Sequence, residues 1–154
     1  MATSRVLVQF EAEADARVAV ALRLPARSPV LVLKRLRLAG AEPLSVQTAH
    51  IPAALVPGLH VADGMSLYEV LQARYHLYPA QARETYVAAL ADSSTAQLLG
   101  IPAGSPVFGV ERVTFTHNER PFEFVQSTVR GDRYSIVLAL VKNAGEQQAL
   151  TLNS

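Results

Sequence analysis

A seven-residue motif that occurs twice constrains the fold more than any other feature of the chain. Leu-Pro-Ala-Arg-Ser-Pro-Val at 24–30 recurs as Ile-Pro-Ala-Gly-Ser-Pro-Val at 101–107, an offset of 77 residues. Each copy follows a helical segment and precedes a strand, a turn and a second strand that begins at a proline, Pro43 or Pro121. The repeat predicts a duplicated helix-plus-hairpin unit closing into one mostly antiparallel β-sheet with helices packed on it. The expected fold class is α+β. The alternative is that this short motif recurs by chance.

Hydrophobic periodicity predicts the elements around the two motifs. Strands are expected at 5–10, 30–38, 43–51, 83–91, 107–115, 122–129 and 134–141. Helices are expected at 11–23, from Ser66 to a point before Pro79, and at 92–99. The polar residues 143–154 form a tail, so that the folded domain is expected to span residues 1–142.

Composition excludes several classes of function. At 154 residues, with 50% hydrophobic and 18% charged side chains, the chain fits one domain with its own core. It has no cysteine, so a disulfide framework, a thiolate nucleophile and a cysteine zinc site are excluded. A net charge of +1 argues against direct binding of nucleic acid. The sequence carries no signal peptide or membrane-spanning run, which indicates a cytoplasmic location.

The sequence also contains no recognisable motif for metal binding, nucleophilic catalysis or nucleotide binding. The four histidines are too scattered for a metal-ligand pattern, and Ser66 lacks the second glycine of a nucleophile elbow. No nucleotide-binding glycine pattern occurs. We therefore expect no metal, no cofactor and no serine hydrolase activity.

The remaining candidate is a site for an anion. Arg35 and Arg37 share one face of a predicted strand, because strand side chains alternate, and Lys34 points the other way. Each guanidinium can hold a carboxylate or phosphate with two hydrogen bonds. Ser66 opens a helix, whose N-terminus offers free backbone N–H groups to the same kind of ligand. From spacing alone, surface ion pairs for the arginines and a simple capping role for Ser66 explain the pattern somewhat better than a binding site does.

Several motifs in order resemble the UTRA domain, the effector-binding half of HutC-type transcription regulators in the GntR superfamily. They are Arg-Leu-Arg-Leu-Ala-Gly-Ala-Glu-Pro-Leu from Arg35, Ile51-Pro52, Ser66-Leu67-Tyr68, the step from Leu98-Leu99 to Pro106-Val107, Pro121-Phe122-Glu123, and Arg-Gly-Asp-Arg-Tyr at 130–134. Each motif is weak alone, but their order and spacing from about Arg5 to Leu140 make the resemblance specific.

The resemblance implies a chorismate-lyase-like fold, a homodimer and a small effector bound in a cleft of the sheet. Family effectors include phosphorylated sugars and small organic acids. By position, the anion-binding arginines of the family correspond to Arg35 and Arg37, its helix-start ligand to Ser66 with Tyr68 nearby, and its acidic ligand for sugar hydroxyls to Glu123. The family would contact DNA through a winged-helix domain that normally precedes this one and is missing here. The abrupt Met-Ala-Thr-Ser start favours an excised domain over a natural stand-alone one.

The chain departs from the family pattern at two positions, Val129 and His76. Many relatives have an aromatic residue before Arg-Gly-Asp, and a glycine often follows the tyrosine that precedes His76. These departures leave the identity of the effector open. Two rivals also stay open: a chorismate-lyase-like enzyme, in which Glu123 or Glu84 would serve as general acid, and a dimerisation module with a vestigial pocket.

Overall fold

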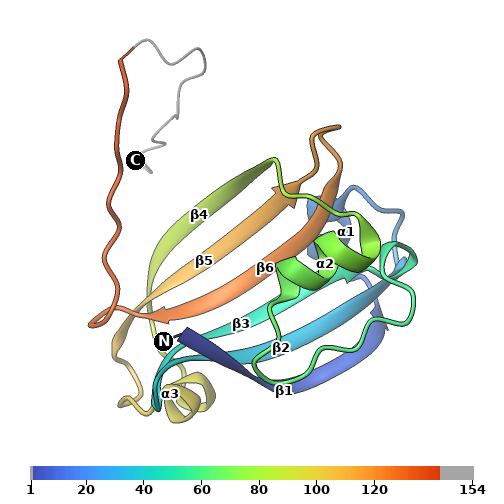
Figure 1. Ribbon diagram of the computed structural model, residues 1–154. Coiled ribbons are helices and arrows are strands. Elements are labelled where there is room, and N and C mark those ends of the chain that lie inside the picture. The colour runs from blue at the N-terminus through green and yellow to red at the C-terminus, as the bar shows by residue number, and fades with distance from the viewer. Residues whose placement is uncertain (1, 143–154) are drawn as a thin grey trace.

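The computed structural model describes residues 2–142 and contains one six-stranded antiparallel sheet in the order β1-β2-β3-β6-β5-β4 (Figure 1). The strands are β1 (Ala2–Glu13), β2 (Pro29–Ala39), β3 (Glu42–Pro52), β4 (Gln81–Leu90), β5 (Pro106–Phe115) and β6 (Pro121–Arg130). The helices are α1 (Ala16–Leu22), the 3-10 turn η1 (Ala53–Leu55), α2 (Leu67–Tyr75) and α3 (Ser93–Leu99). The predicted α+β class is confirmed.

The sheet consists of two matching halves that meet where β3 pairs with β6. Each half runs strand, helix, strand, strand, and its first two strands pair with each other. The repeated motif forms the same turn in both halves: the Ser28 Oγ donates to the Pro25 carbonyl at 2.7 Å, and the Ser105 Oγ donates to the Pro102 carbonyl at 2.6 Å. The duplication predicted from the sequence is therefore present in the backbone.

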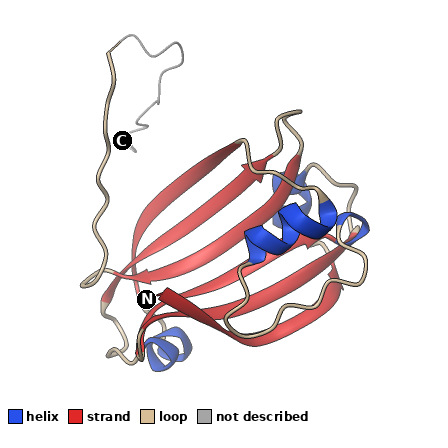
Figure 2. Cartoon of the chain, in the orientation of Figure 1, coloured by secondary structure: helices blue, strands red, loops and turns tan. Residues whose placement is uncertain are grey.

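The helices cover the two faces of the sheet unequally (Figure 2). On one face α1 packs against β6 and α3 packs against β3, so each of these helices lies over the other half's strand. On the opposite face the segment from η1 to α2 buries the main hydrophobic core, which includes Leu33, Ile51, Leu71 and Phe122. Asp15 and Asp92 cap α1 and α3 by accepting backbone N–H bonds of 2.8 Å from Val18 and Thr95.

Two predicted elements are wrong. The helix expected at 11–23 begins only at Ala16, because β1 continues to Glu13 and pairs with β2 as far as Pro29. The strand expected at 134–141 does not form: these residues leave the sheet after β6 without a strand partner among the described residues. The predicted tail, 143–154, lies outside the described residues.

Candidate effector site

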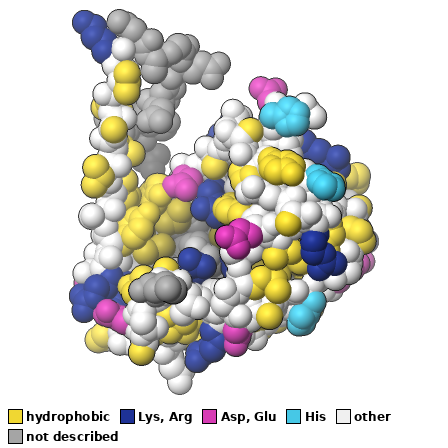
Figure 3. Space-filling view, in the orientation of Figure 1, with side chains coloured by type: hydrophobic (Ala, Val, Ile, Leu, Met, Phe, Trp, Pro, Cys, Tyr) yellow, Lys and Arg dark blue, Asp and Glu magenta, His cyan; other side chains and the backbone are white. Residues whose placement is uncertain are grey.

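A cavity of about 420 Å³ lies on the α2 face of the sheet. All five residues singled out from the sequence line it: Arg35, Arg37, Ser66, Tyr68 and Glu123. In Figure 3, basic and acidic side chains surround a hollow in the middle of the visible face. The structure therefore brings the five predicted residues together, although nothing in the chain alone assigns them a ligand.

The two arginines reach the cavity because β2 places alternate side chains on one face. Arg35 is only 7% exposed, and Arg37 lies two residues further along the same strand, nearer the opening. Burial lowers the pKa of Arg35, and the positive charge of Arg37 lowers it further. A guanidinium in this position keeps its charge at neutral pH but lacks the hydration that it would have on the surface.

Ser66 is held at the cavity by the loop that precedes α2. The loop is fastened to β1: the Val6 N–H donates to the Asp63 carboxylate at 2.7 Å, and the Gly64 N–H donates to the Ser4 carbonyl at 2.8 Å. Ser66 is the N-cap of α2, and its Oγ accepts a long bond of 3.5 Å from the Glu69 N–H. The predicted cap is confirmed, and it points the open end of α2 toward the arginines.

Glu123 forms the buried polar end of the cavity. Its side chain is 2% exposed, and it accepts a hydrogen bond of 2.6 Å from the Tyr68 hydroxyl. Thr114 approaches the same oxygen at 3.5 Å and the Tyr68 hydroxyl at 3.2 Å. Burial and the neighbouring Glu123 charge raise the pKa of Tyr68 to about 12, so Tyr68 is a neutral donor at physiological pH. The carboxylate keeps further acceptor capacity for ligand hydroxyl groups.

Arg112 is a cavity residue that the sequence analysis did not select. Its Nη2 lies 3.7 Å from the Glu123 Oε1, and its guanidinium carbon lies 5.6 Å from the centre of the Tyr68 ring. The repeat contained the signal, since Arg112 lies 77 residues after Arg35 and occupies the same place in the second half. The two halves thus each contribute one arginine to the cavity.

The buried guanidinium groups are incompletely satisfied. Within residues 2–142, the Nε of Arg35 and the Nε of Arg112 have no hydrogen-bond partner. A buried donor without a partner costs roughly 1–3 kcal/mol, more when it belongs to a charged group. The cavity therefore favours a ligand that brings acceptor oxygens and negative charge.

Other candidate chemistry lies elsewhere. Glu84, the alternative general acid, is on β4 outside the cavity lining and sits 3.9 Å from the Arg112 Nη1. His50 stacks on Phe124 on the opposite face of the sheet from Arg35. Within the described part of the chain, no three His, Asp or Glu residues are grouped as a metal site. None of the described helices is long and apolar enough to cross a membrane.

Comparison with known proteins decides the family. The model of the UTRA domain matches residues 1–135. The chain belongs to the UTRA domain family. The HTH-type transcriptional repressor NagR of Bacillus subtilis is 33% identical over 112 residues, which are 71% of this chain and 46% of that protein. The HTH-type transcriptional regulator GgaR of Escherichia coli K12 is 31% identical over 120 residues, which are 78% of this chain and 48% of that protein.

Solved structures of transcription regulators have the same fold. The effector domain of PhnF from Mycobacterium smegmatis matches with a TM-score of 0.86 and 27% identity, covering 92% of this chain and 88% of that one. A GntR-family transcriptional regulator from Enterococcus faecalis matches with a TM-score of 0.81 and 26% identity, covering 89% and 99%. The chain spans about half the length of the curated relatives it matches. It is an effector-binding domain of the kind that GntR-family regulators carry, and these relatives regulate transcription.

Proposed function

We propose that this UTRA domain senses a small anionic metabolite, such as a sugar phosphate or an organic acid, for a bacterial transcription regulator. The observation that carries the proposal is the buried, unpartnered Nε of Arg35, with a second on Arg112, in a cavity that also holds the open end of α2. Arg35, Arg37 and Ser66 would bind the anionic group. Tyr68 and Glu123 would bind the hydroxyl groups of the rest of the ligand.

Charge supports an anionic ligand. Three arginines, Arg35, Arg37 and Arg112, line the cavity with one carboxylate, Glu123. The formal sum is three positive charges and one negative, a net of +2. A ligand with two negative charges would neutralise it, and a phosphate monoester or a dicarboxylate fits this requirement.

The domain would transmit binding as a homodimer. In the whole regulator, DNA would be contacted through a winged-helix domain outside this chain. An effector that binds one dimer arrangement more tightly than another shifts the population toward it, and a difference of a few kcal/mol suffices to change operator affinity.

A thermal-shift panel of sugar phosphates, phosphonates and small carboxylic acids tests the proposal. A ligand at about 100-fold its Kd should stabilise the domain by about 2.7 kcal/mol. We expect the double variant Arg35→Ala/Arg37→Ala to lose this shift. Lys34→Ala is the control, since it removes a positive charge from the opposite face of the same strand and should keep the shift. An undiminished shift in the double variant would contradict the assigned site.

A further inference from the structure

The loop that leads into α2 is hydrogen-bonded along the edge strand β1. We call residues 60–66 the strap, and Figure 1 shows this segment running beside β1 before the chain enters α2. The Gln9 side chain bonds both backbone groups of Val61: its Oε1 accepts from the Val61 N–H at 2.8 Å, and its Nε2 donates to the Val61 carbonyl at 3.1 Å. Neighbouring strands bond each other through the same two backbone groups. The strap therefore takes the place of a further strand at this edge of the sheet.

Asp63 fastens the strap to the residue of β1 that pairs with Arg35. The Val6 N–H donates to the Asp63 Oδ1 at 2.7 Å, and Val6 is the partner of Arg35 in the β1–β2 register. The register shifts between Val6 and Val8, as it does at a β-bulge, and bulges re-aim side chains next to binding sites. Asp63 thus ties the strap to the part of β1 that lies beside the buried guanidinium of Arg35.

The cap of α2 is too weak to fix the position of Ser66 by itself. The Ser66 Oγ accepts from the Glu69 N–H at 3.5 Å, whereas the cap bonds of Asp15 and Asp92 to α1 and α3 are both 2.8 Å. A backbone N–H bond usually measures about 2.7–3.2 Å, and it weakens beyond that distance. The distance between Ser66 and the arginines is therefore set mainly by the bonds between the strap and β1.

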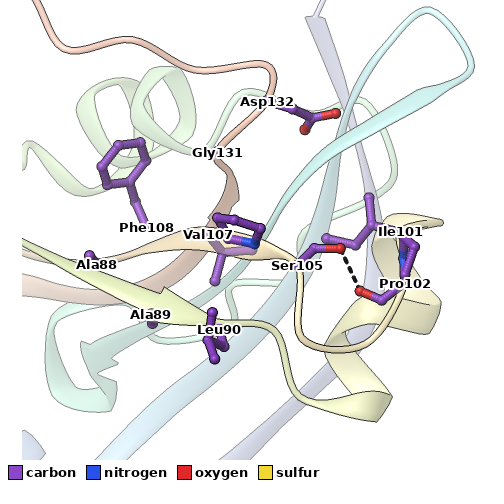
Figure 4. A pocket seen from close by; sticks show the side chains of 11 residues that line it. Ala88, Ala89, Leu90, Ile101, Pro102, Ser105, Val107, Phe108, Gly131 and Asp132 are labelled. Carbon is purple, nitrogen blue, oxygen red and sulfur yellow. Dashed lines mark hydrogen bonds between the residues drawn. The ribbon is translucent and has the colours of Figure 1, made fainter.

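The other large cavity has polar side chains that are already satisfied. It is an apolar groove of about 690 Å³ where β4 and β5 meet the turn after β6 (Figure 4). The Ser105 hydroxyl in its lining donates to the Pro102 carbonyl at 2.6 Å, and the Asp132 carboxylate accepts from Arg130 at 2.8 Å. By contrast, the Arg35 Nε has no partner within residues 2–142. The geometry of ligand-binding donors therefore matters at the Arg35 cavity.

We infer that Asp63 and Gln9 are positioning residues for the effector site. Through the strap, they hold Ser66 at the distance from Arg35 that one bound anion bridges. Neither side chain lines the cavity, so each acts on a ligand only through the strap. A binding group displaced by about 1 Å loses much of its hydrogen-bond energy, which makes such support necessary. The inference rests on the proposed function, because it concerns the same anion.

The charge of Asp63 and its positioning role predict opposite effects on binding. Removing a negative charge near an anion site tightens anion binding if electrostatics alone acts. Losing the bond to Val6 instead releases the strap and weakens binding. Asp63→Asn separates the two effects, because asparagine has no charge but its side-chain oxygen still accepts the Val6 N–H.

Titrations with inorganic phosphate and with malonate at constant ionic strength test the inference. For each probe that the parent chain binds, we expect Asp63→Ala to raise the Kd about tenfold. Asp63→Asn should bind at least as tightly as the parent chain, and Gln9→Ala should weaken binding. Asp15→Ala is the matched control and should leave the Kd unchanged. Asp15 is also an exposed aspartate that accepts a backbone N–H, at 2.8 Å, but it lies on the opposite face of the sheet.

Amide hydrogen exchange measures the release of the strap without any ligand. The Gly64 N–H donates to the Ser4 carbonyl at 2.8 Å, next to the bond that Asp63 makes. In Asp63→Ala we expect the Gly64 amide to exchange about tenfold faster than in the parent chain, and the Val18 amide at the start of α1 to be unchanged. Asp15→Ala should give the reverse pattern, because Asp15 holds the Val18 amide.

The outcomes separate this inference from the proposed function. If Asp63→Ala binds a probe as tightly as the parent chain, or if Asp63→Asn binds as weakly as Asp63→Ala, the positioning role is overturned and the proposed function stands. If the parent chain binds neither probe and no member of the thermal-shift panel, the proposed function fails and the positioning role fails with it. Should Asp63→Ala not fold, Gln9→Ala supplies the same comparison at the other end of the strap.

Discussion

Arg35 is a buried cation whose pKa depends on the charged residues around it. Burial and Arg37 lower its pKa, whereas the charge of Glu123 raises it. Glu123 is in turn held by the Tyr68 hydroxyl and lies 3.7 Å from Arg112. The cavity thus contains an anion already, placed at its buried end, and leaves Arg35 and Arg37 available toward the open end of α2.

Removing the buried carboxylate of Glu123 should destabilise the folded chain. Glu123→Ala leaves Arg112 without its buried partner and the Tyr68 hydroxyl without its acceptor, so we expect the free energy of unfolding to fall by about 3 kcal/mol. Urea unfolding at neutral pH measures the loss. Glu84→Ala removes the more exposed partner of Arg112 and should cost no more than about 0.5 kcal/mol. Equal losses in the two variants would show that burial of the carboxylate does not matter.

Tyr68 predicts a stability change at high pH. The folded chain holds the phenol proton until about pH 12, whereas an unfolded tyrosine releases it near pH 10. Since the folded state then binds more protons than the unfolded state, the free energy of unfolding should fall as pH rises from about 10 to about 12. Tyr68→Phe should flatten this part of the profile in urea titrations. A slope identical to that of the parent chain would contradict the buried hydrogen bond.

At the scale of the elements, the turn after β6 depends on a glycine. A Cβ at Gly131 would lie 2.8 Å from the Pro106 carbonyl oxygen, closer than real Cβ contacts come, so Gly131→Ala must move the turn or β5. We expect a loss of about 1–3 kcal/mol in stability. Gly109→Ala, whose Cβ would meet the Val87 carbonyl oxygen at an ordinary 3.7 Å, is the control and should be nearly neutral. Chemical denaturation measures the free energy of unfolding of both variants. If Gly131→Ala lost no stability, the turn would accommodate the added Cβ without cost.

The sequence was sufficient for elements whose signals are local. The repeated Pro-Ala-x-Ser-Pro turns, the Ser66 cap of α2 and the period-two face shared by Arg35 and Arg37 could all be predicted. The extension of β1 to Glu13 could not, because it depends on pairing with Pro29, far along the chain. The apolar pattern at 134–141 is typical of a strand, but a strand needs a partner edge, and within the described chain this segment has none.

For the candidate site, the sequence analysis selected five residues that line the cavity, but it did not find every cavity residue. Five residues were chosen and all line one cavity, mainly because the family resemblance added Tyr68 and Glu123 to the arginines and Ser66. Arg112 was missed because strand periodicity alone does not say which strands share a cavity. Only the sheet order, with β5 next to β6, brings it there.

At the scale of the whole molecule, the proposed homodimer predicts that thermal stability depends on protein concentration. If two chains bury a shared interface, dissociation accompanies unfolding and Tm should rise as the concentration rises. Calorimetry over a hundredfold range of concentration measures this rise. A constant Tm in the full chain would count against any dimer coupled to folding.

Arg35 and Arg112 hold matching places in the two halves, yet their neighbours differ: Thr114 stands where Arg37 stands in the first half. A half-length ancestor that paired with itself would have changed both walls of its pocket with every mutation. Fusion of the halves into one gene removes that constraint. Each wall can then diversify separately, so a symmetric scaffold can come to recognise molecules whose two ends are chemically unlike.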